Sequence, residues 1–241
     1  VLMKMKEVLE KFKPNLLLVH GDTSTTLASS LAGFYKKIPI AHIESGLRTN
    51  NLMSPWPEEA NRKITDTLSH LHFPPNINAK NFLKKENIKS ISMKTTGNTV
   101  IDSLIFIKNK INKSNKLKKR LESKYNFLDR KKKLILVTAH RRENFGIGIR
   151  EICKSLEYIA NKNPQTQIVY PVHLNPNISN TVYKLLSNID NIHLIKPIDY
   201  VSFVFLMMKS YIILTDSGGI QEEAPTLSKP LIIVRDETER P

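Results

Sequence analysis

A run of residues near the C-terminus has the composition of an anion-binding turn. Ile212 to Leu214 has the pattern of a buried strand, Asp216-Ser-Gly-Gly219 ends it, and a helical pattern begins at Ile220. Such a turn leaves backbone N–H groups unpaired at the positive end of a helix, and two glycines let a phosphate approach closely. The glutamates that follow could accept hydrogen bonds from ribose hydroxyls. The pattern favours a nucleotide, although an ordinary tight turn uses the same residues.

Acidic residues in the first half of the chain are candidates for proton transfer. Asp22 follows a predicted strand and a glycine, Glu44 ends a second strand, and Glu58 and Glu59 come just after Pro57. Asp22 could instead cap the Thr-rich helix that follows it, and the helix dipole alone explains one of the two glutamates after the proline. Acids from three neighbouring loops nevertheless offer the paired carboxylates that general acid–base catalysis requires.

Basic groups at a strand end in the second half would suit a pyrophosphate. His140-Arg-Arg-Glu143 places a histidine and two arginines after an apolar run. Arginine can bind phosphate oxygens in a bidentate way, and histidine can donate a hydrogen bond. Arg142 and Glu143 could equally form a local ion pair. His173, after a later apolar run, could face the same site or cap a helix.

Several other kinds of site lack a signal in the sequence. The histidines have no metal-ligand spacing, and neither GxGxxG nor GxxxxGK[ST] occurs, so metal, NAD and P-loop interpretations have no support. Cys153 is the single cysteine, which excludes an internal disulfide and fits a reducing cytoplasm; its helical pattern predicts a core position. No apolar run approaches the roughly 20 residues that a membrane span needs.

The elements that must position these side chains alternate between apolar runs and helical patterns. Strands are predicted at 16–19, 38–43, 71–73, 91–95, 134–137, 167–172, 192–195, 211–215 and 231–234. Helices are predicted at the N-terminus, at 23–37, from 58, around 78–85, and at 99–111, 149–160, 176–186 and 201–208, with one more after the glycine turn. Repeated alternation indicates parallel sheets with helices on both faces.

A polar and only partly helical stretch, Asn112 to Lys133, is the best candidate for a domain boundary. We therefore predict an α/β protein of two doubly wound domains, at 1–115 and 116–241. Ligands of such sheets bind beyond the carboxyl ends of the strands, which predicts a binding cleft between the domains.

The chain is strongly basic, with 37 Lys and Arg against 22 Asp and Glu among its 241 residues and a formal net charge of +15. This balance raises nucleic acid as a partner. However, the lysines gather in short runs without the interleaved aromatic side chains that base stacking requires. We therefore predict a solvated basic surface that attracts an anionic substrate, and no nucleic-acid partner.

Eight motifs occur in order along the chain. They are His20-Gly-Asp-Thr23, His42-Ile-Glu-Ser-Gly-Leu-Arg-Thr49, Ser54-Pro-Trp-Pro-Glu-Glu-Ala-Asn-Arg62, Thr96-Gly-Asn-Thr99, Thr138-Ala-His-Arg-Arg-Glu-Asn144, Pro171-Val-His-Leu-Asn-Pro176, Thr215-Asp-Ser-Gly-Gly-Ile-Gln-Glu-Glu-Ala-Pro225 and Arg235-Asp-Glu-Thr-Glu-Arg-Pro241. Together they resemble the bacterial non-hydrolysing UDP-N-acetylglucosamine 2-epimerases over essentially the whole chain.

The resemblance implies a GT-B-like fold of two Rossmann-like domains facing a cleft, and a reaction at C2 of UDP-N-acetylglucosamine. UDP is eliminated to give a 2-acetamidoglucal and is then added back to give UDP-N-acetylmannosamine, a surface-polysaccharide precursor. It implies no cofactor and no metal, and a cytoplasmic homodimer when the chain is complete. The resemblance also assigns site residues: Asp22, Glu44 and Glu58 as catalytic acids, His140 as phosphate partner, Ser217, Gly218 and Gly219 as phosphate turn, Glu223 as ribose ligand, Phe203 near the uracil and Arg240 on the substrate.

The chain also departs from this family pattern. Family members begin with a strand and a Gly-Thr-Arg-Pro-Glu loop, and they continue after the last motif into further helices, so we expect a truncated chain with an incomplete first domain. Two alternatives stay open: an inactive remnant that at most binds UDP, and a GT-B glycosyltransferase, which would need an acceptor pocket.

Overall fold

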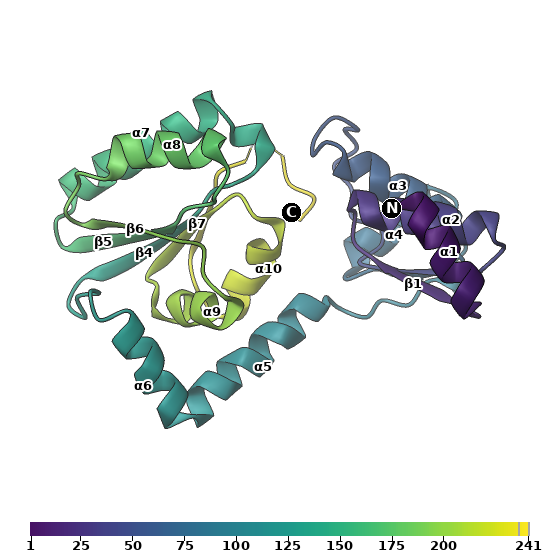
Figure 1. Cartoon of the computed structure of the whole chain (residues 1–241), viewed down its shortest axis with the longest axis horizontal. Helices are drawn as coiled ribbons and strands as arrows, with labels where there is room; N and C mark the ends of the chain where they lie inside the picture. The colour runs from purple at the N-terminus through teal and green to yellow at the C-terminus, as the bar shows by residue number, and fades with distance from the viewer. Residues whose placement is uncertain (236, 241) are drawn as a thin grey trace. The chain divides into compact units, whose positions relative to one another are not determined.

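The computed structural model describes residues 1–235 and 237–240, which form two compact units (Figure 1). Residues 1–98 and 237–240 make up the first unit, and residues 99–235 make up the second.

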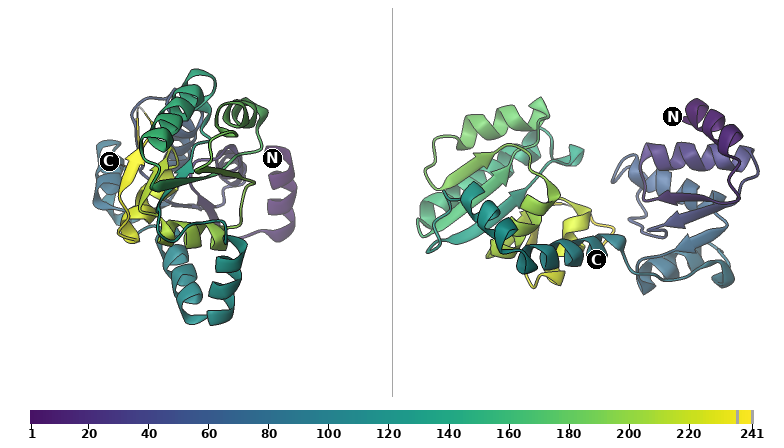
Figure 2. Two further views of the ribbon diagram at one scale, coloured as in Figure 1. Left: turned by 90° about the vertical axis from the view of Figure 1, so that its left-hand side faces the viewer. Right: turned by 60° about the horizontal axis from the view of Figure 1, so that its bottom comes forward.

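The second unit begins earlier in the chain than the predicted boundary at 115/116. That boundary assigns α5 (Thr99–Lys113) to the first domain, but α5 packs against α9 (Tyr200–Lys209) and α10 (Gly218–Thr226). Its side chains Leu104 and Ile111 are fully buried in a core of the second unit. The apolar face of the helix therefore decides to which unit it belongs. The polar stretch that follows contains a further helix, α6 (Asn115–Lys124), which forms a helical hairpin with α5 (Figure 2).

The described part of the first unit contains a parallel sheet of strand order β1-β2-β3. Its strands are β1 (Leu17–His20), β2 (Ile40–Ile43) and β3 (Leu71–Phe73), and its helices are α1 (Leu2–Phe12), α2 (Ser24–Tyr35), α3 (Glu58–Leu68) and α4 (Ile77–Lys85). The register pairs His20 with Ile43, and Ile43 with Phe73, so the strands end at the same edge. The loops that carry Asp22 and Glu44 leave the sheet at this edge.

Helix α2 lies close to the strands because one of its contact residues is a glycine. A Cβ at Gly33 would stand 2.9 Å from Leu17 Cδ2 and 3.4 Å from Ile40 Cγ1. The helix begins at Thr23, whose hydroxyl accepts the backbone N–H of Thr26 as an N-cap. The end of β1 and the start of α2 are thus fixed by local chemistry.

The sheet of the second unit is parallel throughout, with strand order β6-β5-β4-β7-β8. Its strands are β4 (Lys133–Thr138), β5 (Thr166–Pro171), β6 (Ile192–Ile195), β7 (Ile212–Thr215) and β8 (Leu231–Ile233). Helices α7 (Ile147–Lys162) and α8 (Pro176–Leu186) cover one face, and α5, α9 and α10 cover the other, with α6 (Asn115–Lys124) beside α5 (Figure 1). The strand order reverses between β4 and β7, the switch point at which ligands of such sheets bind.

Each face of this second sheet has its own apolar core. Cys153 of α7 is a free, fully buried cysteine in one of them, beside Ile149 and Leu156, as its helical spacing predicts. Burial raises the pKa of its thiol to about 11, so the cysteine is a packing residue and not a nucleophile.

One predicted strand is wrong. Residues 91–95 do not form a strand; a 3-10 turn at Ser90–Ser92 precedes a single bridge between Met93 and His72. A backbone hydrogen bond from Lys94 to His72 continues the contact by one residue. The turn takes up the first two residues of the predicted strand, which leaves too few for a strand to form. Among the described residues, no helix has both the length and the apolar character needed to cross a membrane.

Candidate active site

The loops after β1 and β2 bring His20, Asp22 and Glu44 to one edge of the first sheet. Gly21 has a φ of 69° and Glu44 a φ of 67°, so both loops turn through the left-handed region. A non-glycine residue seldom adopts this region, and such residues concentrate at functional sites. A Cβ at Gly21 would stand 3.5 Å from Glu44 Oε2, which places the two loops in direct contact.

Glu44 is the more firmly ionised of the carboxyls at this edge. His20 Nε2 lies 3.3 Å from its Oε2, Asn98 Nδ2 donates to its Oε1 at 3.2 Å, and the guanidinium of Arg240 also donates to Oε1. Burial opposes ionisation, but the hydrogen bond from His20 and the charges of Arg240 and His20 outweigh it and lower the pKa of Glu44 to about 2. The same hydrogen bond raises the pKa of His20, against the effect of burial.

Asp22 is perturbed in the opposite direction. Burial raises its pKa, and the charge of Arg62, whose Nη2 lies 2.7 Å from Asp22 Oδ2, only partly offsets this. The negative charges of Glu44, Glu239 and Glu58 raise it further. The alternative that Asp22 caps α2 is wrong, because Thr23 holds that position.

The two glutamates at the start of α3 have different environments. Glu59 is fully buried, accepts the backbone N–H groups of Thr49 and Asn50, and lies 3.2 Å from Arg62. It therefore holds the preceding loop against the helix. Glu58 is half-buried, and its charge acts on Asp22, so it is the one that fits a role at the site.

In the second unit, His140 follows β4 and lies beside a buried carboxylate. Its ring stacks on His173 with centroids 5.8 Å apart, and its Nδ1 is 3.4 Å from Asp216 Oδ1. Burial lowers the pKa of His140, as do the charges of Arg141 and His173, whereas Asp216 opposes the shift. Burial therefore favours the neutral form of the imidazole near pH 7.

Asp216 fixes the loop that carries His140. Its Oδ2 accepts the backbone N–H groups of His140 and Arg141, both at 2.7 Å, and the side-chain amide of Asn144 at 3.0 Å. The strand end of β7 therefore organises the strand end of β4. The sequence offered Arg142 as an ion-pair partner of Glu143. In the structure Glu143 pairs with Arg235, whose Nε lies 2.6 Å from Glu143 Oε1.

The glycine turn after β7 is the start of α10 itself. Ser217 is the N-cap, Gly218 and Gly219 are the first two helical residues, and the backbone N–H of Ser217 donates to Thr215 Oγ1 at 3.0 Å. Within the described residues, no atom lies within 4 Å of the place where a Cβ of Gly219 would stand. The helix start is thus open on the side of this glycine, as an approaching phosphate requires.

Glu223 has a hydrogen-bond partner that the sequence did not predict. The hydroxyl of Tyr200, the first residue of α9, donates to its Oε1 at 2.6 Å. Burial raises the pKa of Glu223, while the hydrogen bond from Tyr200 opposes the shift. Phe203, one turn later in α9, is half-buried and packs against the apolar core.

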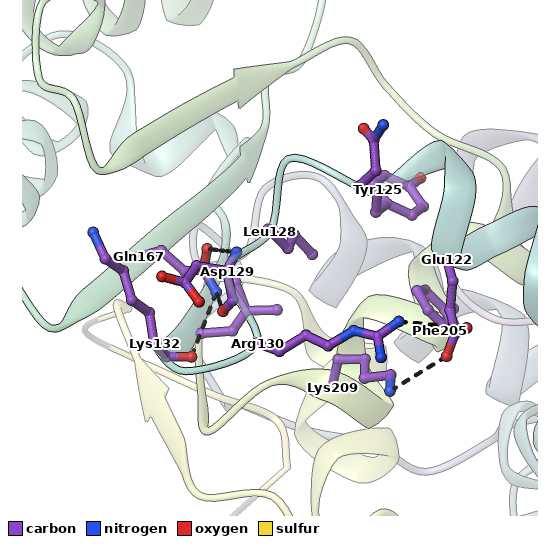
Figure 3. A pocket seen from close by; sticks show the side chains of 11 residues that line it. Glu122, Tyr125, Leu128, Asp129, Arg130, Lys132, Gln167, Phe205 and Lys209 are labelled. Atoms are coloured by element: carbon purple, nitrogen blue, oxygen red, sulfur yellow. Dashed lines mark hydrogen bonds and ion pairs between the residues drawn. The ribbon is translucent and has the colours of Figure 1, made fainter.

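A cavity of about 360 Å³ lies elsewhere in the second unit (Figure 3). Residues near the amino ends of β4 and β5 line it, including Leu134 and Gln167, so it opens at the opposite edge of the sheet from His140. Arg130 and Lys209 both point toward Glu122 at its rim, at 3.7 and 4.0 Å. None of the described residues that line this cavity is a residue that the sequence predicts for the site.

Comparison with known proteins decides the family. The family model described as UDP-N-acetylglucosamine 2-epimerase matches residues 1–241. The chain belongs to the UDP-N-acetylglucosamine 2-epimerase family. It is 55% identical over 241 residues to the UDP-N-acetylglucosamine 2-epimerase of Yersinia pestis and 52% identical to that of Escherichia coli strain K12, and it spans 64% of the length of each of these two relatives.

Solved structures of family members share the fold. The Neisseria meningitidis UDP-GlcNAc 2-epimerase bound to UDP-GlcNAc superposes with a TM-score of 0.98 at 53% identity, over 100% of this chain and 64% of that one. The Methanocaldococcus jannaschii enzyme, in complex with UDP-GlcNAc and UDP, gives 0.88 at 33% identity, over 100% and 65%. The GT-B-like class of two Rossmann-like units is therefore confirmed.

Four residues that the sequence analysis did not assign to the site contact predicted site residues directly. They are His20, Arg62, Asn98 and Tyr200. The first three lie inside motifs that carry the resemblance, so a signal for them existed. Tyr200 has none, because its contact depends on how α9 packs beside α10. Among the described residues, no group of three or more His, Cys, Asp or Glu could hold a metal ion, and the expectation that no metal is required stays a prediction.

Proposed function

We propose that this protein interconverts UDP-N-acetylglucosamine and UDP-N-acetylmannosamine by eliminating and re-adding UDP. Family membership supports the proposal, as do the relatives whose structures hold UDP-GlcNAc and UDP. The observation that carries it is the contrast between two carboxyls on touching loops, Asp22 with a raised pKa and Glu44 with a lowered one.

Elimination requires a base at C2. The base takes the C2 proton, the C–H electron pair becomes the C1–C2 double bond, and the C1–O bond breaks to release UDP. In the return step the double bond takes a proton on the opposite face of C2, and UDP adds to C1. Both steps need groups whose pKa lies near the operating pH.

Asp22 is the better matched of the two carboxyls for this proton transfer. A carboxylate with a pKa of about 2 is a weak base, and Glu44 is bound by two cationic partners. We assign it the role of a fixed anion that orients His20 and Arg240. Glu58, at the start of α3, is the second candidate for proton transfer, since inversion at C2 needs groups on both faces of the sugar ring.

The second unit supplies the groups for UDP in this proposal. The neutral His140 donates its N–H to a phosphate oxygen and stabilises the charge that develops as UDP leaves. The turn of Ser217, Gly218 and Gly219 binds the pyrophosphate through the backbone N–H groups of the two glycines, and Glu223 accepts a hydrogen bond from a ribose hydroxyl. Phe203 lies near the uracil, and Arg240 of the first unit binds the substrate.

The decisive experiment is incubation with UDP-N-acetylglucosamine in D2O. We expect deuterium at C2 of both epimers, because the proton removed exchanges with solvent before its return. Turnover without this label would contradict the mechanism. A parallel titration with UDP separates the alternatives, since binding without product marks a remnant that has lost the reaction.

We further propose a homodimer and a cytoplasmic location, as family resemblance implies. Sedimentation of the purified protein tests the first, and fractionation of cells that produce it tests the second. A monomer at all concentrations would contradict the dimer.

A further inference from the structure

A buried group of four charged side chains lies beneath the two loops that carry Asp22 and Glu44. It consists of His42 of β2, Arg48, Asp66 of α3 and Glu86 at the end of α4. The side chains of the first three are between 0 and 1% exposed, and that of Glu86 is 33% exposed. We call these residues the buried charge cluster.

Asp66 is the centre of the buried charge cluster. Its Oδ1 lies 2.6 Å from His42 Nδ1, and its Oδ2 accepts from Arg48 Nη2 at 2.7 Å and from the backbone N–H of Gly46 at 3.1 Å. Arg48 also donates to both carboxylate oxygens of Glu86, at 2.8 and 2.5 Å. Every oxygen of Asp66 is therefore occupied, which a buried carboxylate requires.

The cluster reaches the first catalytic loop through His42. Its Nε2 lies 2.8 Å from the carbonyl oxygen of Gly21, the residue between His20 and Asp22. The backbone N–H of Gly21 donates to the carbonyl of Ile43 at 3.0 Å, so both backbone polar groups of this glycine are held from β2.

The cluster reaches the second catalytic loop through Gly46, two residues after Glu44. Gly46 has a φ of 81°, and a Cβ on it would stand 2.4 Å from the carbonyl oxygen of Ala79. Only glycine fits at this position, and the backbone N–H of Gly46 donates to the carboxylate of Asp66. One carboxylate is thus tied to both loops.

Hydrogen bonds hold the ring of His42 at both nitrogens. The carbonyl of Gly21 can only accept, so Nε2 carries a proton. Burial opposes ionisation of Asp66, but the hydrogen bond and charge of His42 and the charge of Arg48 lower its pKa. The ring therefore links the carboxylate of Asp66 to the loop at Gly21.

We propose that Asp66 and His42 are positioning residues that hold the loops at 20–22 and 44–46 in the arrangement that brings Asp22 and Glu44 together. The proposal rests on the proposed function for its catalytic meaning. A buried ion pair adds little net stability compared with apolar packing, but it specifies geometry, and that is the property that two touching catalytic loops need.

His42→Asn and His42→Gln form a matched pair for the test. The asparagine amide can stand in for Nδ1 and keep the contact with Asp66, but it does not reach Gly21. The glutamine amide can stand in for Nε2 and keep the bond to the Gly21 carbonyl. Lys154→Ala, which removes an exposed ion pair with Glu151 in the second unit, is the control.

The ligand-free readout is the titration of His20, followed by NMR in the 241-residue chain. Its pKa is raised by Glu44 only while the two loops keep their arrangement. We expect the raised value to persist in His42→Gln and in the control, and to fall toward the ordinary value of about 6.5 in His42→Asn. The amide signals of Gly21 and Gly46 should shift in the same variant. An unchanged His20 titration in a folded His42→Asn protein would overturn the proposal.

If His42→Asn does not fold, Asp66→Asn carries the test, since an unchanged His20 titration in a folded Asp66→Asn protein would also overturn the proposal. The catalytic readout is separate: we expect kcat to fall by on the order of 10- to 100-fold in His42→Asn with KM little changed. Absence of epimerisation by the unsubstituted protein would count against the proposed function, and the NMR result would still decide the positioning role.

Discussion

At the scale of single residues, the candidate site depends on two carboxyls driven in opposite directions. Glu44 is surrounded by His20, Asn98 and Arg240, which favour its charged form, whereas burial and neighbouring carboxylates disfavour the charged form of Asp22. Two carboxyls thus differ in pKa because of what surrounds them, which is the usual way in which proteins separate acid from base.

Substitution of Asp22 by asparagine tests the first of these roles. The change preserves shape and removes the ionisable carboxyl, so we expect kcat for epimerisation to fall by about 10²- to 10⁴-fold. UDP affinity, measured by calorimetry, should be unchanged because the groups proposed for UDP belong to the second unit. An active asparagine variant would rule out Asp22 as the group that moves the C2 proton.

The lowered pKa of Glu44 predicts a pH-dependent stability. The folded state binds its proton less tightly than the unfolded state, so the contribution is complete above the ordinary value of 4.5 and is lost as the pH falls toward 2. The full shift corresponds to about 3 kcal/mol as an upper bound. Urea unfolding of the protein and of Glu44→Gln should differ near neutral pH and converge as the pH falls. Parallel curves across this range would contradict the assignment.

At the scale of elements, glycines decide how closely segments approach one another. Gly33 lets α2 lie against β1 and β2, and Gly46 lets the loop after β2 pass the carbonyl of Ala79. Gly219 differs from both, since the space beside it is open among the described residues. The first two glycines serve packing, and the third is the one that we propose for phosphate binding.

Gly46→Ala and Gly97→Ala separate steric clash from backbone strain. Both glycines have positive φ, 81° and 79°, but a Cβ at Gly97 meets no described atom within 4 Å. We expect Gly97→Ala to cost about 1 kcal/mol and Gly46→Ala more than about 3 kcal/mol of unfolding free energy. Chemical denaturation measures both, and equal losses would show that the contact with Ala79 relaxes freely.

Gly219→Ala should affect stability and binding in opposite directions. Alanine is a better helix former than glycine by about 1 kcal/mol, and the site has room for a Cβ, so the variant should unfold at a higher temperature. The same methyl group would stand where we propose that the pyrophosphate approaches, and UDP affinity should fall at least about 10-fold. Unchanged UDP affinity would place the phosphates elsewhere.

At the scale of the whole molecule, two units supply different chemistry. The first concentrates carboxylates at one sheet edge, and the second places a neutral histidine and a helix start at the carboxyl ends of β4 and β7. The net charge of +15 acts on both, because a basic surface concentrates anions around the protein.

This charge predicts that UDP binding weakens as salt is raised toward physiological ionic strength, where screening acts over about 8 Å. Uridine, which lacks the phosphates, is the matched control and should bind with no such dependence. Calorimetry in a series of KCl concentrations measures both. Equal salt dependence for the two ligands would mean that the basic surface does not act on the phosphates.

The amino-acid sequence was enough to predict the class of fold and the family, and its motifs also supplied the candidate site residues. Hydrophobic periodicity is local, so α8 and β6 match their predicted bounds, and motif residues such as Asp22, Glu44 and His140 are found at strand ends as expected. Only the tertiary fold shows that α5 packs in the second unit, that residues 91–95 form no strand, that Tyr200 contacts Glu223, and that His42 contacts Asp66 and the carbonyl of Gly21. These contacts join segments far apart in the chain, and no local pattern encodes a distance between them.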